Sequence, residues 1–298
     1  MSTMSRMASI IILALIITSV GYYILQNNSK KVTQSNEILI VSTFPSLVDD
    51  IKLVTCANET VETIVPKGVD PHDYQLTPRD AGLLKKATVI VSTGHAPFEI
   101  KIRNLVESNE TRAILIEIPK MPGIKILNNP VTGEPNYHMP IMDPYNYILF
   151  MEKLVTVLNQ VDPKCASIHV QNLHKVNAEI EQLLKFKGEY NMTVIASDPT
   201  VQYEVSWLGL KVKYLFVIEH GTPASFDELN KINKALTSKE VHCIIASTST
   251  SRQLQDLINS ISAGSFNVRI AYIPGPLADG SIPEKLNETI TDLQVCQK

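Results

Sequence analysis

The sequence predicts an α/β protein with two lobes of mainly parallel sheets, joined by one long spanning helix and preceded by an apolar N-terminal segment. Three observations predict this class. Short apolar runs of strand length alternate with segments of helix length. One mid-chain segment keeps helical spacing for long enough to reach along two lobes. The chain has 298 residues, which is enough for two domains of ordinary size.

Composition excludes several classes of protein. The chain has 27 lysines and arginines against 30 aspartates and glutamates, a net charge of -3. A dedicated nucleic-acid binder would usually carry a basic face, so we expect no nucleic-acid partner. Hydrophobic residues make up 44% and charged residues 19% of the chain. This balance excludes intrinsic disorder.

The first apolar segment is a run without charge from Met7 to Leu25. It is about long enough to cross the hydrocarbon core of a bilayer as a helix. The cleavage site that Ser19-Val20-Gly21 would offer is weak, so we expect residues 1–25 to be a signal anchor and residues 26–36 a polar tether. A cleaved signal peptide is the alternative. In both cases we expect the rest of the chain on the outer face of the cell membrane.

Sequons and cysteines agree with export. Five Asn-x-Ser/Thr sequons could accept glycans, and they begin at Asn27, Asn58, Asn109, Asn191 and Asn287. Four cysteines permit two disulfides in any of three connectivities. We prefer Cys243 with Cys296, which would tie the last helix to a strand, and leave the pairing of Cys56 and Cys165 open. The alternative is that all four are buried free thiols.

The strands follow one another along the chain as short apolar runs. They are expected at Ile38 to Ser42, Val61 to Val65, Thr88 to Ser92, Ala113 to Ile118, Thr193 to Ala196, Val212 to Phe216, His242 to Ala246 and Val268 to Ile273. Helix-length segments separate most of these runs, which favours parallel pairing.

Three helices show their starts as a capping residue followed by proline: Thr77-Pro78, Asp143-Pro144 and Asp162-Pro163. The third runs to residue 187, where Gly188 ends it, and would be roughly 38 Å long at 1.5 Å per residue. The expected organisation divides the exported part at this helix. It consists of an N-terminal lobe over 38–161, the spanning helix over 162–188 and a C-terminal lobe over 189–298.

Candidate metal ligands occur in loops that follow strands, where open α/β sheets bind their ligands. His72 lies in a loop stiffened by two prolines and a glycine, and His138 precedes a capped helix. Asp198 directly follows a strand of the second lobe, and Asp279 lies in a later loop. Imidazoles and carboxylates together suit zinc, manganese or iron(II). Each residue also has an ordinary interpretation, as a surface histidine, a helix cap or a turn aspartate.

The stretch VPKGVDPHDYQLTPRDAGLLKKATVIVSTG, residues 65–94, resembles the signature of the metal-specific solute-binding proteins of ABC transporters. This is the zinc/manganese-binding group whose lobes are joined by one long helix. The resemblance covers roughly residues 37–298. It implies that the chain is not an enzyme, that Zn²⁺ or Mn²⁺ is its transported ligand, and that an ABC permease is its partner. Some zinc-binding members also have a disulfide where Cys243 and Cys296 fall.

The resemblance also assigns ligands. The first family ligand falls on His72, the second on His138 and the third on Asp198. The fourth, an acid, falls near Pro274-Gly275, where this chain has no carboxylate, so Asp279 is the expected substitute. His95 lies where the family usually has no histidine and could complete the site from the first lobe. His220, after a strand of the second lobe, is a further possibility.

Two other functions stay open. In a zinc-dependent hydrolase, His72, His138 and Asp198 would hold the metal and a water would take the fourth position. None of the candidate loops supplies a convincing glutamate as general base for such a reaction. The third possibility is a binding protein for a metal chelate, whose own groups would replace the missing fourth ligand.

Overall fold

The structure is a computed structural model that describes residues 37–219, 221–264, 266 and 268–297. The expected anchor and tether, residues 1–36, lie outside the described residues. Among the described helices, none has the length and apolar character that crossing a membrane requires. The two lobes lie within one compact unit, Ile38–Lys298.

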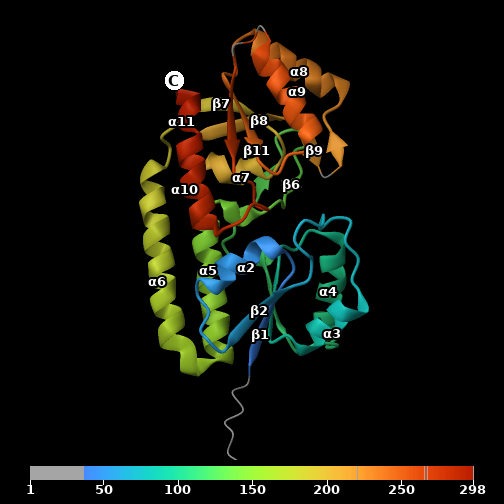
Figure 1. Ribbon diagram of the computed structural model, residues 1–298, viewed down its shortest axis with the longest axis vertical. Coiled ribbons are helices and arrows are strands. Elements are labelled where there is room, and N and C mark those ends of the chain that lie inside the picture. Colours follow the sequence, from blue (N-terminus) through green and yellow to red (C-terminus); the bar gives the residue numbers. More distant parts are fainter. Residues whose placement is uncertain (1–36, 220, 265, 267, 298) are drawn as a thin grey trace, which may run out of the picture. The chain divides into compact units, whose positions relative to one another are not determined.

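The first lobe is built on a four-stranded parallel sheet with the strand order β2-β1-β3-β4. The strands are β1 (Ile38–Ser42), β2 (Glu59–Thr63), β3 (Val89–Ser92) and β4 (Ile114–Glu117). The helices and 3-10 turns of this lobe are η1 (Pro45–Leu47), α2 (Val48–Lys52), α3 (Pro78–Lys86), α4 (Pro97–Glu107), η2 (Ile118–Lys120), η3 (Pro140–Met142) and α5 (Pro144–Val161). In Figure 1, α3 and α4 lie on one side of the sheet and α5 on the other.

The second lobe has a matching parallel sheet with the order β12-β11-β7-β8. Its strands are β7 (Met192–Ala196), β8 (Leu210–Leu215), β11 (Cys243–Ser247) and β12 (Arg269–Ile273). Its helices are α7 (Val201–Ser206), α8 (Phe226–Thr237), α9 (Arg252–Ala263), α10 (Ile282–Asp292) and α11 (Gln294–Gln297). Two small antiparallel ribbons pair β5 (Leu127–Asn128) with β6 (Pro135–Asn136) and β9 (Val217–Glu219) with β10 (Thr222–Pro223). The predicted class, α/β with mainly parallel sheets, is confirmed.

The two sheets are oriented so that the carboxyl ends of their strands face the boundary between the lobes (Figure 1). One hydrophobic core continues through both lobes and includes Ile40 of the first sheet, Tyr147 of α5 and Leu286 of α10. A second, smaller core lies in lobe two between α8, α9 and the sheet, around Ile232 and Ile258. The loops that follow the strands are therefore held on a rigid base.

The long helix consists of three consecutive parts: η4 (Pro163–Cys165), α6 (Ala166–Leu183) and η5 (Leu184–Phe186). It runs beside both lobes and contacts α5 and α10 (Figure 1). Gly188 follows with φ 69°, a left-handed conformation that glycine adopts without strain and that ends the helix. The expected helix over 163–187 thus corresponds to these three parts.

Of the three predicted caps, two are present. The Thr77 hydroxyl accepts the Asp80 N–H, and the Asp143 carboxylate accepts the N–H groups of Tyr145 and Asn146. The prediction for Asp162 is wrong. Its carboxylate instead accepts a hydrogen bond of 2.7 Å from the Asn58 side chain, and it makes no capping bond to the helix.

The four cysteines form two disulfides. Cys243 of β11 is bonded to Cys296 of α11, the pair that the sequence analysis prefers, and Cys56 is bonded to Cys165.

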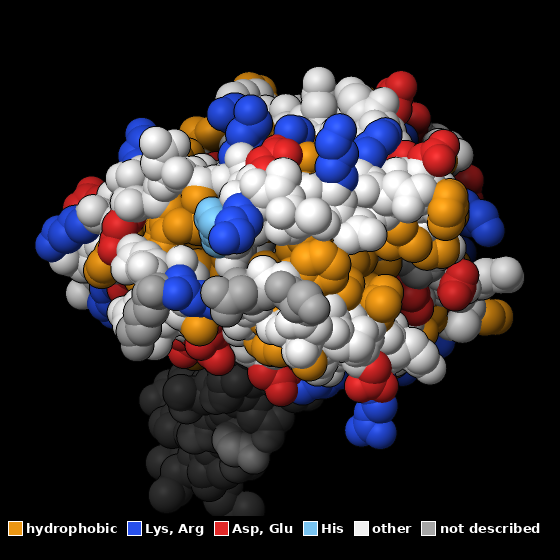
Figure 2. Space-filling model, turned by 90° about the horizontal axis from the view of Figure 1, so that it is seen from above, with side chains coloured by type: hydrophobic (Ala, Val, Ile, Leu, Met, Phe, Trp, Pro, Cys, Tyr) orange, Lys and Arg blue, Asp and Glu red, His pale blue; other side chains and the backbone are white. Residues whose placement is uncertain are grey.

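On the face seen in Figure 2, basic and acidic side chains lie beside one another with hydrophobic side chains between them.

Candidate metal site

His72 lies in the loop between β2 and α3. Its backbone N–H donates to Asp70 Oδ1 at 2.9 Å, and its Nδ1 atom lies 3.2 Å from the same oxygen. The carboxylate therefore holds both the backbone and the ring of His72. With Nδ1 facing Asp70, Nε2 is the nitrogen positioned for a metal ion, in the arrangement common among metal-binding histidines.

His138 lies just after β6, separated from the strand by Tyr137 alone. A tight turn begins here, in which Met139 has φ 52°. The Asn136 side-chain oxygen accepts the His138 N–H at 3.0 Å and lies 2.9 Å from the Nδ1 atom of His138. Asn136 is buried, and its amide nitrogen donates to the Pro199 carbonyl and to the Gln202 side chain, both in lobe two. The residue that orients His138 is thus also a direct link between the lobes.

His95 follows β3 and precedes α4. Its Nδ1 atom lies 3.1 Å from the Thr93 hydroxyl, which itself donates to Glu99 at 2.8 Å. Because a hydroxyl has a single proton to give, Thr93 must accept from Nδ1–H, which leaves the lone pair on Nε2. Burial lowers the pKa of His95 to about 4, although the nearby Glu99 carboxylate acts in the opposite direction. The ring is therefore neutral at pH 7, the form that binds metals.

The structure brings these three histidines together. One ligand atom from each of His72, His95 and His138 lies within 4.8 Å of the others. The ring centroids are separated by 5.2 Å for two of the pairs and 6.0 Å for the pair of His72 and His138. Nitrogens that share one zinc ion at 2.0–2.1 Å each are about 3.3 Å apart, so small rotations of half-buried rings would close the distance. We call these three residues the histidine cluster.

A cavity of about 220 Å³ between the lobes adjoins the cluster. His72 and His138 form part of its wall from lobe one, and Asp198, Thr200 and Ser247 form part of it from lobe two. Asp198 is engaged in its own turn: its carboxylate accepts from the Ser197 hydroxyl at 2.7 Å and from the Thr200 N–H at 3.0 Å. It therefore lies beside the cavity as the acceptor that stabilises the start of α7.

The other expected acid, Asp279, lies at the surface. Its side chain is 79% exposed and forms an ion pair with Lys67, which lowers the pKa of this carboxyl. His220, the remaining histidine that sequence analysis considered, lies outside the described residues.

Glu219 is the residue that sequence analysis missed. It ends β9, and its Oε2 atom lies 3.6 Å from the Nε2 atom of His138. The buried Asn129 side chain donates to Glu219 Oε1 at 2.9 Å and to the Ile218 carbonyl at 2.7 Å, which fixes the direction of the carboxylate. Glu219 precedes His220 in the sequence and lies at the end of a strand, and this pattern is the one from which it could have been predicted as a ligand.

The comparison with protein families gives a match over most of the chain. The model of the family described as zinc-uptake complex component A, periplasmic (ZnuA), matches residues 40–279. The chain belongs to the ZnuA family. This family comprises metal-binding solute-binding proteins of ABC transporters, so the resemblance seen in residues 65–94 is confirmed.

Individual relatives are distant members of the same group. SloC of Streptococcus mutans, a metal ABC transporter substrate-binding lipoprotein, is 22% identical over 74% of this chain and 76% of its own length. MtsA of Streptococcus pyogenes, an iron ABC transporter substrate-binding lipoprotein, is 22% identical over 78% of this chain and 79% of its own length. A solved periplasmic metal-binding protein from Candidatus Liberibacter asiaticus superposes with a TM-score of 0.69 at 20% identity, covering 87% and 99% of the two chains. This structural similarity supports the two-lobe fold.

Proposed function

We propose that the chain captures a zinc ion in the histidine cluster on the outer face of the cell membrane and delivers it to an ABC permease. The observation that carries this proposal is the approach of three imidazoles within 4.8 Å of one another. Nitrogen donors suit zinc, whereas manganese prefers sites rich in carboxylate and water oxygens. The cluster therefore ranks zinc above manganese and iron(II).

The fourth donor would come from lobe two, so that the ion itself holds the lobes together. Glu219 is our first choice because Asn129 already directs its carboxylate toward His138. Asp198 is the second choice, since it would have to give up its bonds to Ser197 and Thr200. Asp279 is the third, because it would have to leave Lys67 at the surface. Three imidazoles and one carboxylate would complete a tetrahedral zinc site.

The test is metal binding by the purified full-length chain, measured by titration calorimetry and by mass spectrometry of bound metal. Substitution of any cluster histidine by alanine, His72→Ala first, should abolish or strongly reduce zinc binding. His174, an exposed histidine of α6, provides the matched control, and His174→Ala should bind zinc like the parent. Unchanged zinc content in the His72→Ala and His95→Ala variants would defeat the proposal. Parallel titrations with chelated zinc would distinguish capture of the free ion from capture of a chelate.

A further inference from the structure

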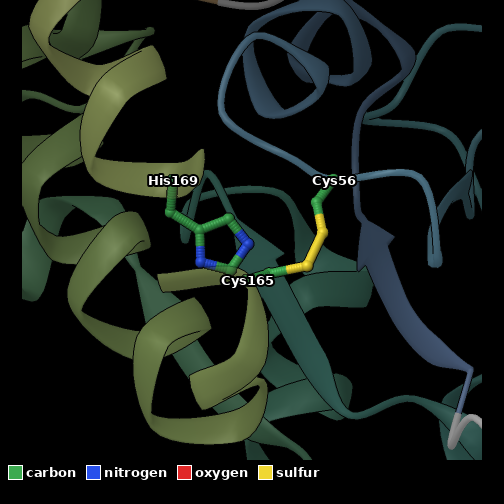
Figure 3. A group of neighbouring side chains, drawn as sticks. All are labelled: Cys56, Cys165 and His169. Atoms are coloured by element: carbon green, nitrogen blue, oxygen red, sulfur yellow. A yellow bond between two sulfur atoms is a disulfide. The ribbon is translucent and has the colours of Figure 1, made fainter. Parts of the chain in front are cut away.

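A second group of metal-binding side chains lies at the start of the long helix (Figure 3). It contains Cys56, Cys165 and His169, and one ligand atom from each lies within 4.8 Å of the others. Cys56 and Cys165 form a disulfide, and Figure 3 shows an edge of the His169 ring pointing toward it. This group shares no residue with the histidine cluster, and cysteine sulfur and histidine nitrogen are both donors that zinc binds in proteins.

His169 is wholly buried, and both of its ring nitrogens face oxygen atoms. Nδ1 lies 2.9 Å from Asn159 Oδ1, and Nε2 lies 2.9 Å and 3.0 Å from the two oxygens of Glu59. Nε2 thus faces both oxygens of Glu59, so a metal ion bound to Nε2 would also lie beside this carboxylate.

Glu59 is held where it could serve as a fourth donor. Its side chain is wholly buried, and its Oε2 atom accepts the Cys56 N–H at 2.7 Å. The carboxylate therefore contacts both the imidazole and the backbone of one of the two cysteines. Cys56 is only half-buried, which gives an ion a route to the sulfur atoms.

We propose that reduction of the Cys56–Cys165 disulfide converts this group into a second zinc site, with Cys56, Cys165 and His169 as ligands and Glu59 as the fourth donor. A dithiol reductant supplies two electrons and two protons to the disulfide and becomes a disulfide itself. Zinc then binds the two sulfur atoms as thiolates and displaces the two thiol protons. The two states exclude each other, because a sulfur bonded in a disulfide is not a thiolate ligand.

The second disulfide serves as an internal control. Within the residues that the structure describes, Cys243 and Cys296 belong to no group of three metal-binding side chains. Reduction would open both disulfides, but only the one beside His169 is expected to gain a metal ion. The inference is thus independent of the proposed function, which uses other residues.

The experiment uses the full-length chain carrying His72→Ala, His95→Ala and His138→Ala, so that the histidine cluster contributes no binding. The oxidised protein should bind no zinc. After reduction and anaerobic removal of the reductant it should bind about one zinc ion per chain. Cobalt(II) in place of zinc should give sulfur-to-metal charge-transfer absorption, which a histidine site does not produce. Glu59→Gln should weaken binding about 10- to 100-fold.

Two double variants complete the test. Cys56→Ser with Cys165→Ser should abolish the cobalt signal, and Cys243→Ser with Cys296→Ser should keep it. The reduced parent chain, without any substitution, should show the same thiolate absorption, which guards against a variant that fails to fold. Absence of this absorption in the reduced parent, or its persistence in the variant lacking Cys56 and Cys165, would overturn the proposal.

Discussion

Each imidazole of the histidine cluster has an oxygen atom facing its Nδ1 position. The three oxygens belong to Asp70, Thr93 and Asn136. Such contacts fix the orientation of the ring and direct Nε2 to the metal, and their loss usually costs 10- to 100-fold in metal affinity. The orientation of the three rings therefore depends on these three oxygen atoms as well as on the histidines themselves.

Thr93 offers a clean test of this dependence. Thr93→Val keeps the shape of the side chain but removes the acceptor for His95 Nδ1–H, so zinc affinity should fall about 10- to 100-fold in titration calorimetry. The control is Thr156→Val, because Thr156 lies exposed on α5 and its hydroxyl bonds only to the Glu152 carbonyl among the contacts described. Equal affinities for the two variants would show that Thr93 does not orient the ligand.

The lobe-two donor can be identified by comparing three acids. Glu219→Gln should weaken zinc binding by about tenfold or more, since it removes the charge that Asn129 directs toward His138. Asp279→Asn should leave the affinity unchanged because its carboxylate is paired with Lys67 at the surface. The loss of zinc affinity in Asp198→Asn should be intermediate between these two. A large effect of Asp279→Asn with none of Glu219→Gln would reverse our ranking.

The sequence predicts three residues of the proposed site. His72 and His138 are expected ligands in loops after strands, and His95 is the alternative ligand. Glu219 was missed because its distance from His138 depends on how lobe two folds toward lobe one. A local pattern in a single sequence cannot predict the distance between two residues on different lobes.

At the scale of elements, apolar runs predicted the strands of both main sheets, although β2 and β8 each begin two residues before the expected run. The ribbons β5–β6 and β9–β10 were not predicted, because strands of two or three residues are too short to show alternation. Asp162 shows a second limit. Its cap-and-proline pattern is genuine, but a tertiary hydrogen bond from Asn58 takes the carboxylate that the cap would need.

Helix α3 follows the loop that carries His72, and its start is held by a capping box. Thr77 accepts the Asp80 N–H, and Asp80 accepts the Thr77 N–H at 2.7 Å. Thr77→Ala should therefore lower the free energy of unfolding by about 1 kcal/mol in urea titrations. Thr237→Ala, at the exposed end of α8, is the control and should have a smaller effect. Equal losses would argue against the importance of the cap.

At the scale of the whole molecule, buried charged groups lie where the lobes meet. Asp50 of α2 accepts the Tyr147 hydroxyl at 2.7 Å and the Ile282 N–H of α10 at 2.8 Å. Lys285 and Glu204 are also buried, and Lys285 donates to the Pro276 carbonyl in the loop beside the cavity. Burial raises the pKa of Asp50 to about 6, against the opposing effects of its hydrogen bonds and of Lys285.

This shift predicts how stability depends on pH. Between about pH 4 and 6 the folded protein keeps the Asp50 proton and the unfolded chain loses it. The contribution of Asp50 is therefore present at low pH and falls by about 3 kcal/mol as pH rises through this window. Asp50→Asn cannot ionise but keeps an oxygen for Tyr147 and Ile282. The stability of this variant relative to the parent should rise with pH in urea unfolding, and a constant difference would contradict the assignment.

The central claim is that three imidazoles converge on one zinc ion. X-ray absorption fine structure at the zinc edge, measured on the oxidised full-length chain loaded with one equivalent of zinc, tests it most directly. We expect a first shell at about 2.0–2.1 Å with the multiple scattering of three imidazole rings and one oxygen donor. A shell of oxygen atoms alone, or the scattering of fewer than three imidazoles, would be incompatible with this site.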